Sequence, residues 1–364
     1  MATVPLPKDR PHNGVKTAAR KEILAKLGVG QEVFDQARRR FPVQWPAYYL
    51  SLVGQDPKRD PIAKMGRPTE AELRFDAGDL ADPIADRRLR PIPFLVRKYP
   101  DRVIVLATKK CHFYCRFCFR REEPVSGKGE PGSEDWARIF AYLADHPEIE
   151  EPILSGGDPL TLSNHRLFWI RDQLMAISSV KRWRIHSRAP VHYPERVTDE
   201  LLEELAIGKP LTVVTHFNHA AELTGESRRI AEKLESLDIP FKNQAVLLAG
   251  VNDHAQVQRA LWRGLAELGV RPHYLHHPDR VSGNAAFRVT IERGLGIYRE
   301  LVRDWQGERP RYVLDLPDGR GKVPVEKLVA VGEGLYRFSH ADGTLSDYHD
   351  IDEIRPRSEP RAAD

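Results

Sequence analysis

From Arg102 onward, apolar runs of strand length alternate with amphipathic stretches of helix length, and this alternation constrains the fold more than any other feature. Such alternation is typical of βα units that build a parallel sheet. Strands are predicted at Arg102–Thr108, Pro152–Leu154, Arg182–His186, Leu211–His216, Lys242–Leu248 and Pro272–His276. Helices are predicted at Glu134–Asp145, His165–Ile177, Glu200–Ile207, Glu226–Leu237, Ala255–Leu268 and Thr290–Arg303. Six units are too few to close an eight-stranded barrel. The sequence therefore predicts an α/β fold with an open, partial (βα)6 barrel.

The segments on either side of the alternating region differ from it in composition. Residues 1–95 are rich in charge and proline, with helical patches at Thr17–Leu27 and Gln31–Phe41, and we interpret them as a helical N-terminal extension that covers one end of the core. Residues 96–305 form the predicted barrel. Residues 306–364 form a small C-terminal α+β segment with short strands and glycine-containing turns. We expect this segment to pack across the mouth of the barrel or against another subunit.

Clusters of polar side chains follow the predicted strands at their C-terminal ends. They are the cysteine run 111–118, the run Ser155-Gly156-Gly157-Asp158, the pairs Ser187-Arg188 and Asn218-His219, and Asp279. The loops at this end of a βα barrel converge on one mouth, where active sites form. The sequence therefore predicts one site that is built from these loops.

The three cysteines of the chain, Cys111, Cys115 and Cys118, lie within eight residues. They are too close together, and the wrong number, for a disulfide framework, which indicates a reducing compartment and a metal. Thiolates at the spacing C-x3-C-x2-C can hold three irons of a four-iron cubane and leave the fourth iron open to a small chelating ligand. The alternatives are a zinc site with His112 as fourth ligand, or three buried thiols without a metal.

Charge and hydropathy narrow the classes of partner. The formal net charge is +4, and the 56 basic and 52 acidic residues are spread along the chain. Nucleic acid is therefore not the expected partner, although a basic entrance for acidic small molecules stays open. No apolar run is long enough to span a bilayer, and the first residues do not resemble a secretory leader. We expect a cytoplasmic protein.

The cysteine spacing, with the aromatic Phe117 before the last cysteine, resembles the motif of the radical S-adenosylmethionine (SAM) superfamily. The resemblance implies that the open iron chelates SAM, whose reductive cleavage gives a 5′-deoxyadenosyl radical. The run Ser155-Gly156-Gly157-Asp158 matches the superfamily's glycine-rich element that receives the methionyl amino group, although alone it is an ordinary turn. Ser187 and Gln244 are further candidate contacts to the SAM ribose or carboxylate, and each is equally compatible with a polar core position.

Flanking motifs narrow the resemblance to the lysine 2,3-aminomutase family. The matching runs are 97–102, 118–121, 215–219, 243–248 and 250–253, and the resemblance extends from about Asp82 to Tyr348. It implies pyridoxal phosphate (PLP) as a second cofactor, with Lys322 as the Schiff-base lysine, where the alternative is an exposed loop lysine. It also implies that Arg102 binds the PLP phosphate and that Tyr99 lies near the ring. Lys98 stands where the family usually has a second arginine.

The same resemblance assigns the substrate contacts. Arg120 matches the arginine that pairs with the substrate carboxylate, and Asp279 and Asp315 match two carboxylates that hold the distal ammonium of lysine. Two acids that face one cavity repel each other unless a cation lies between them, which favours a diamino acid over glutamate. Asp315 is alternatively a turn cap.

Two departures from the family pattern modify these expectations. Longer members carry a C-terminal cysteine-rich zinc site, but this chain has no cysteine after Cys118, so we expect no zinc. Phe117 replaces a histidine of those members and matches the shorter group that acts on lysine destined for elongation factor P.

The prediction is an isomerase that converts L-lysine to β-lysine with a [4Fe-4S] cluster, SAM and PLP. It would use a reducing electron donor and form a homo-oligomer, a dimer. The alternatives are the same amino shift for elongation factor P, or on arginine, ornithine or glutamate. An iron–sulfur protein for electron transfer or sensing is the non-enzymatic alternative, and it leaves Lys322 and Arg120 without a role.

Overall fold

The computed structural model describes residues 6–7, 17–74, 76, 78–122 and 129–351 of the chain. Its main element is a nine-stranded sheet in which the strands follow one another in sequence order. Strands β2 to β8 run parallel, and β1 and β9 at the two edges run antiparallel to their neighbours. The strands are β1 Leu95–Val96, β2 Arg102–Thr108, β3 Glu151–Gly156, β4 Trp183–His186, β5 Leu211–Thr215, β6 Phe241–Val246, β7 Arg271–His276, β8 Arg311–Asp315 and β9 Lys322–Pro324.

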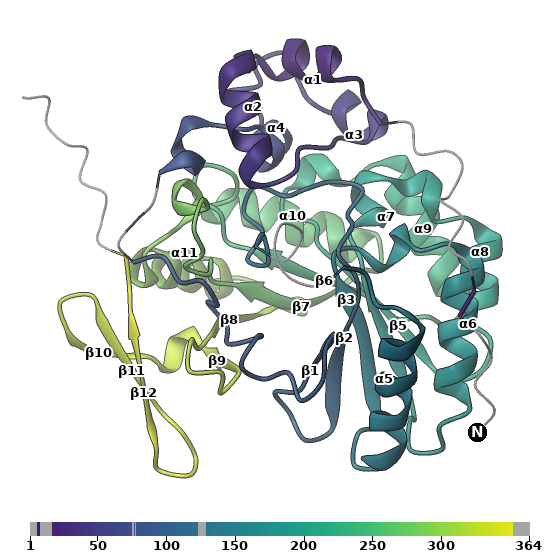
Figure 1. Cartoon of the computed structure of the whole chain (residues 1–364). Coiled ribbons are helices and arrows are strands. Elements are labelled where there is room, and N and C mark those ends of the chain that lie inside the picture. The colour runs from purple at the N-terminus through teal and green to yellow at the C-terminus, as the bar shows by residue number, and fades with distance from the viewer. Residues whose placement is uncertain (1–5, 8–16, 75, 77, 123–128, 352–364) are drawn as a thin grey trace, which may run out of the picture.

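The order of the strands confirms the predicted α/β fold with an open, partial barrel. Each strand pairs with the next along the chain, and β1 and β9 remain as separate edges, so the sheet does not close (Figure 1). All six predicted strands are present, with ends that differ by a few residues. The difference is β8, which pairs in parallel with β7 and adds a seventh parallel strand. Its five residues are too short a run to distinguish, in sequence, from the antiparallel strands that follow.

Helices cover the outer face of the sheet (Figure 1). They are α5 Ser133–Asp145, α6 Asn164–Met175, α7 Ala189–His192, α8 Asp199–Leu205, α9 Gly225–Ser236, α10 Ala255–Glu267 and α11 Ile291–Arg303. Four of them begin at a hydroxyl side chain that accepts a backbone N–H of the first turn, namely Ser163, Thr198, Thr224 and Thr290. Within the described residues no helix is long and apolar enough to cross a bilayer.

The N-terminal region forms a separate group of helices at one end of the barrel (Figure 1). It contains α1 Arg20–Leu27, α2 Gln31–Arg40, α3 Ala47–Ser51, α4 Pro61–Gly66 and a 3-10 turn at Glu70–Leu73. Trp45 from this group packs edge-on against Phe113 of the cysteine loop, with ring centroids 4.8 Å apart. The backbone N–H of Arg116 donates to the carbonyl oxygen of Met65 at 2.8 Å. The extension therefore covers the end of the barrel that carries the cysteines.

The C-terminal region contributes to two sheets. Strands β8 and β9 belong to the barrel, whereas β10 Val329–Gly332, β11 Leu335–Ser339 and β12 Leu345–His349 form a small antiparallel sheet beside it. This small sheet packs against the loop that follows β7, where Tyr348 meets the ring of His277. It therefore lies at one rim of the barrel, and the division of the chain at residues 95 and 305 remains a proposal.

Alternation along the strands separates the apolar core from a polar interior. On β7, Leu275 is fully buried, while Tyr274 and His276 point to the opposite side of the sheet. The same alternation on β6 directs Gln244 to the side of His276. The barrel thus presents polar and aromatic side chains on its inner face.

Candidate active site

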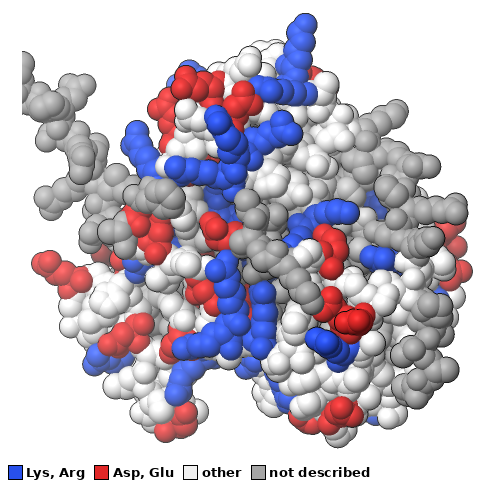
Figure 2. All heavy atoms as spheres, viewed as in Figure 1, with Lys and Arg blue, Asp and Glu red and all other residues white. Residues whose placement is uncertain are grey.

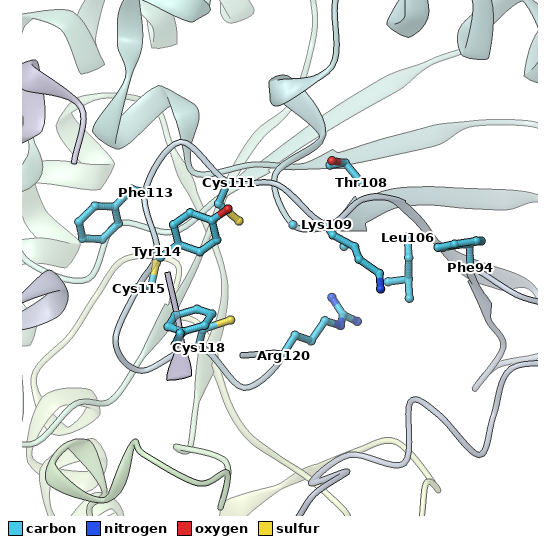
Figure 3. A pocket seen from close by; sticks show the side chains of 13 residues that line it. Phe94, Leu106, Thr108, Lys109, Cys111, Phe113, Tyr114, Cys115, Cys118 and Arg120 are labelled. Carbon is cyan, nitrogen blue, oxygen red and sulfur yellow. The ribbon is translucent and has the colours of Figure 1, made fainter. Parts of the chain in front are cut away.

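The loop that follows β2 brings the three cysteines to one hollow. About 520 Å³ of space that no atom fills lies in the hollow, part of it open solvent. The lining includes Cys111, Cys115, Cys118, Arg120, Gly156 and Gly157. Figure 3 shows the three sulfurs along the same loop, with Arg120 farther along the chain. The loops after β2 and β3 therefore share one site.

The three thiols fit a group that carries several metal ions. Burial raises the pKa of all three cysteines, to about 11 for Cys118, so thiolates are disfavoured unless a cation compensates. Within the described residues no set of three His, Cys, Asp or Glu side chains is placed to hold a single metal ion. His112, the fourth ligand of the zinc alternative, packs its ring against Tyr193 with centroids 4.9 Å apart. Three thiols on one loop are a donor set that suits an iron–sulfur cluster.

Gly156 and Gly157 are required by the close packing of the loops after β2 and β3. Gly156 has a φ of +112°, and a Cβ atom there would lie 2.5 Å from the carbonyl oxygen of Thr108. A Cβ atom on Gly157 would lie 2.2 Å from the carbonyl oxygen of Lys110. The backbone N–H of Gly157 also donates to the oxygen of Thr108 at 2.7 Å. Glycine therefore lets the two loops meet in the wall of the hollow.

The carboxylate of Asp158 ties the loop after β3 to the loop after β4. Its Oδ1 accepts from Oγ of Ser187 at 2.6 Å and from the backbone of Leu160 at 3.0 Å. Its Oδ2 accepts from the backbone N–H of Arg188 at 3.0 Å. Both Asp158 and Ser187 are buried. Their side chains therefore have partners within the protein, and contact with SAM stays a prediction for both.

Ser155 and Gln244 lie on inner-facing positions of their strands. Ser155 Oγ accepts from Nη1 of Arg120 at 3.2 Å. Nε2 of Gln244 lies 2.6 Å from Nε2 of His216 and 3.3 Å from Nδ1 of His186. Burial lowers the pKa of both histidines well below the usual range, so both rings are neutral at pH 7. Neither histidine was predicted to have a role in the site, although each ends a predicted strand.

Lys322 begins β9 and faces Asp315 at the end of β8. Its Nζ lies 3.0 Å from Oδ2 and 3.1 Å from Oδ1 of Asp315. Its backbone N–H donates to Oη of Tyr99 at 3.1 Å. Burial would lower the pKa of Lys322, but the carboxylate of Asp315 outweighs burial and raises the pKa above its ordinary value. A strand pairing therefore positions this lysine, which is not an exposed loop residue.

Arg102 and Tyr99 lie together beside Lys322. The guanidinium carbon of Arg102 is 4.5 Å from the centre of the Tyr99 ring. Nε of Arg102 is buried and makes no hydrogen bond within the described part of the chain; its charged neighbour Asp101 is 3.5 Å away. The forked donors of a guanidinium group suit a phosphate group. A Cβ atom on Gly321 would lie 2.6 Å from Tyr99 Oη, so glycine allows the tyrosine to approach Lys322.

Asp86 connects two residues that the sequence assigns to different ligands. Its Oδ2 accepts from Nε of Arg120 at 2.8 Å, and its Oδ1 lies 3.0 Å from Nζ of Lys98. Burial would raise the pKa of Asp86, but Arg120 and Lys98 outweigh burial and lower it to about 2. Lys98 also donates to the carbonyl oxygen of Ile84. Asp86 therefore fixes the side chain of Arg120, and Lys98 is held by protein groups.

Asp279 and Asp315 form the acidic part of the site. Burial, followed by the nearby Asp315 carboxylate, raises the pKa of Asp279 far above its usual range. Burial would likewise raise the pKa of Asp315, but the positive charge of Lys322 outweighs it and lowers that pKa. One acid of the pair is thus held ionised and the other is poised to take up a cation.

Three residues of the site were not predicted, because they are recognised by the distant residues they contact and not by a local sequence motif. Asp86 stands among many acids of a charge-rich stretch, and nothing local distinguishes it. Tyr274 lies 5.9 Å from Nζ of Lys322, measured from its ring centre, and His276 lies 3.9 Å from Oδ2 of Asp315. The alternation of polar residues along β7 is the signal that would have found Tyr274 and His276.

Comparison with known proteins places these features in context. The chain is 36% identical over 312 residues to L-lysine 2,3-aminomutase of Methanococcus maripaludis, covering 85% of this chain and 72% of the relative. It is 38% identical over 279 residues to the enzyme of the same name from Clostridium subterminale, covering 76% and 67%. It is also 35% identical over 288 residues to glutamate 2,3-aminomutase of Clostridioides difficile, covering 79% and 68%.

The chain was also compared with family models and with solved structures. No family model matches the chain. Among solved structures, a radical SAM methyltransferase from Sphaerobacter thermophilus aligns with a TM-score of 0.42 and 18% sequence identity, covering 60% of this chain and 68% of that one.

Proposed function

The chain belongs to the lysine 2,3-aminomutase family of radical SAM isomerases, and we propose that it converts L-lysine to β-lysine. The relatives include enzymes named for lysine and for glutamate, so the substrate has to be inferred from the site. The observation that carries the proposal is the separation of charge. Arg120 lies in the hollow beside the cysteines, whereas Asp279 and Asp315 lie with Lys322.

We assign the cysteine hollow to the radical chemistry. Cys111, Cys115 and Cys118 ligate a [4Fe-4S] cluster, and SAM binds between them and the residues Ser155, Gly156, Gly157, Asp158, Ser187 and Gln244. When bound and reduced by an electron donor, the cluster and SAM supply a 5′-deoxyadenosyl radical. The extension contributes the ring of Phe41 to the lining of this hollow, and its Trp45 packs behind Phe113, which also lines it. These rings limit the access of water.

We assign the second cofactor to the region around Lys322. Lys322 carries PLP, Arg102 and Lys98 face its phosphate, and Tyr99 lies beside its ring. When bound, PLP supplies the π system through which the amino group moves between carbons. Asp315 accepts hydrogen bonds from the lysine ammonium and thereby controls when its proton leaves.

The substrate proposal follows from the same contacts. Arg120 is held by Asp86 and Ser155 and presents a forked cation to a carboxylate. Asp279, whose pKa is raised by burial, gains most from a cation and suits the distal ammonium of lysine. The carboxylate of lysine therefore meets the positive charge of Arg120, and its distal ammonium meets the acidic group of Asp279.

The test is anaerobic product analysis of the reconstituted protein with lysine, arginine, ornithine and glutamate. The expected product is β-lysine, with about four irons per chain and SAM cleavage that Cys115→Ala abolishes. A β-amino product from glutamate alone would reject the substrate, and SAM cleavage by Cys115→Ala would reject the cluster assignment.

Two further assignments accompany this function. We propose that the protein is a homodimer. We also propose that it holds no structural zinc ion, because all three cysteines of the chain lie in the run 111–118 that we assign to the cluster. Metal analysis of anaerobically purified protein and sedimentation velocity test these points. One zinc per chain or a monomer would contradict them.

A second candidate is the same shift on lysine destined for elongation factor P. Phe117 favours it, because the resemblance of the cysteine motif implies an aromatic residue at this position in that shorter group. The ring packs against Phe287 with centroids 5.9 Å apart. The product is again β-lysine, so the two candidates differ in the acceptor of that product. Transfer of the labelled product to elongation factor P by its ligase would identify this role.

A further inference from the structure

Arg188 follows β4 and reaches the cysteine loop. Its Nη1 lies 2.8 Å from Sγ of Cys115. In the same guanidinium group, Nε donates to the carbonyl oxygen of His216 at 3.0 Å, and Nη2 donates to Oε1 of Glu222 at 2.7 Å. The side chain is buried. Nη2 also donates to Oη of Tyr49 at 3.4 Å. These three hydrogen bonds fix the orientation in which Arg188 meets the sulfur.

Glu222, the acid that holds Arg188, is itself fixed on every side. It is fully buried, and its Oε1 also accepts from Oη of Tyr49 at 2.6 Å. Its Oε2 accepts from the backbone N–H groups of Asn218 and His219 at 2.6 and 3.0 Å. Tyr49 belongs to α3, so the N-terminal extension contributes to the placement of Arg188.

Aromatic rings surround the guanidinium group. Its central carbon lies 5.7 Å from the ring centre of Phe113, 5.6 Å from that of Phe117 and 6.0 Å from that of Tyr49. These rings exclude water from the contact between Arg188 and Cys115. In such surroundings a hydrogen bond from a cation is stronger than on the surface.

We propose that Arg188 is a positioning residue that raises the reduction potential of the iron–sulfur cluster through its hydrogen bond to Cys115. The inference rests on the proposed ligation of the cluster by the three cysteines. One-electron reduction by the donor adds one negative charge to the cluster. A hydrogen bond donated to a ligating sulfur stabilises the more negative form, so reduction becomes easier. Glu222 holds Arg188 in place and offsets part of its charge.

A purely structural ion pair makes a different prediction. If Arg188 and Glu222 only join β4 to the loop after β5, their removal changes stability and leaves the cluster potential unchanged. The double variant Arg188→Met with Glu222→Gln removes both buried charges together, which avoids the large penalty of one unpaired charge. The matched control is Arg196→Met, because Arg196 is equally buried but donates to the carbonyl oxygens of Leu160 and Leu162 and touches no sulfur.

The experiment is a redox titration of the reconstituted proteins, with the reduced cluster followed by electron paramagnetic resonance. We expect the double variant to hold a full complement of iron and to have a midpoint potential lower by about 60 mV or more, which is tenfold in the one-electron equilibrium constant. Arg196→Met should match the wild type. A double variant with full iron and the wild-type potential would overturn the proposal.

A measurement on the unaltered protein decides the matter if the double variant does not fold or loses iron. Protein labelled with ¹⁵N in the arginine guanidinium groups should show a nitrogen hyperfine coupling to the reduced cluster by pulsed resonance methods. Absence of that coupling would refute the contact. Failure of the wild-type protein to assemble four irons would instead reject the proposed function, so the two failures are distinguishable.

Discussion

Nζ of Lys322 lies 3.0 Å from Oδ2 of Asp315, in a cross-strand pair at the edge of the barrel. The sequence assigns these residues to different ligands, the lysine to PLP and the aspartate to the substrate ammonium. The ion pair shows that the two side chains affect each other's protonation. A carboxylate that holds the lysine ammonium also delays the loss of its proton, and only the neutral amine reacts with an aldehyde.

The first prediction is that PLP attaches to Lys322. Borohydride reduction of the PLP-loaded protein, followed by peptide mapping, should locate the pyridoxyl group on the peptide that contains Lys322. Lys322→Ala should lose the covalent label while SAM cleavage without substrate persists, since the cysteine hollow does not include this lysine. A label on Lys109, Lys110 or Lys327 would overturn the assignment.

The second prediction concerns pH and Asp315. The Asp315 carboxylate raises the pKa of Lys322, so PLP capture by the wild type should increase with pH up to the alkaline range. Asp315→Asn removes the largest cause that raises the pKa of Lys322, while burial still lowers that pKa, so the rise should move to lower pH. The measurement is the pH profile of borohydride-trapped PLP. The control is Asp279→Asn, because Asp315 and not Asp279 forms the ion pair with Lys322. This variant should shift the profile less than Asp315→Asn does.

The fold was largely predictable because strand and helix periods differ. Apolar runs such as 102–108 and 211–215 are long enough to identify, and each is followed by an amphipathic helix. The strand Arg311–Asp315 was assigned to the C-terminal segment because a five-residue run carries no sign of whether its partner is parallel or antiparallel. Its place was decided by α11, which leads the chain back to the edge of β7.

Site residues that belong to a local sequence motif were predictable. Residues that act through contacts with distant parts of the chain were less so. The cysteine spacing indicated a cluster without any knowledge of the fold. Asp86, by contrast, acquires its role from Arg120, which is 34 positions away in the chain. Arg188 likewise meets Cys115 across 73 positions. Such contacts depend on how the strands are arranged, which no local pattern records.

The third prediction is that Asp86 stabilises the fold and orients Arg120. Because its pKa is lowered from 3.8 to about 2, its contribution of about 2 kcal/mol is complete above pH 3.8 and is lost as pH falls toward 2. Asp86→Asn leaves Arg120 and Lys98 without their buried acid, so at pH 7 it should destabilise by about 3 kcal/mol. Denaturant unfolding at pH 7 and pH 3 measures both effects, and the difference from wild type should narrow at the lower pH.

The control for Asp86 is an acid that pairs at the surface. Asp342→Asn removes the exposed partner of Arg320 and should leave stability nearly unchanged at both pH values. The role in orientation predicts in addition a higher KM for the amino acid substrate in Asp86→Asn, with PLP binding retained. Equal KM values in variant and wild type would restrict Asp86 to a structural role.

The fourth prediction concerns the choice between lysine and glutamate, and it rests on the raised pKa of Asp279. Because burial and the neighbouring Asp315 hold a proton on Asp279, binding of a substrate ammonium should lower its pKa and release that proton. Calorimetry of lysine binding in buffers of different ionisation enthalpy should therefore detect proton release at pH 7. Asp279→Asn should abolish the release, and glutamate should not cause it.

The same charges determine turnover. Loss of one partner from a buried charge-assisted pair costs about 3 kcal/mol, so Asp279→Asn should lower lysine turnover by about a hundredfold while PLP and SAM binding survive. Glutamate would place its side-chain carboxylate beside the ionised Asp315 and would offer Asp279 no ammonium, so the wild type should turn it over far more slowly than lysine. Arg120→Ala should weaken both substrates alike, because each has an α-carboxylate. If Asp279→Asn keeps the lysine kinetics of the wild type while Arg120→Ala abolishes them, the distal ammonium is recognised elsewhere and the substrate is a different amino acid.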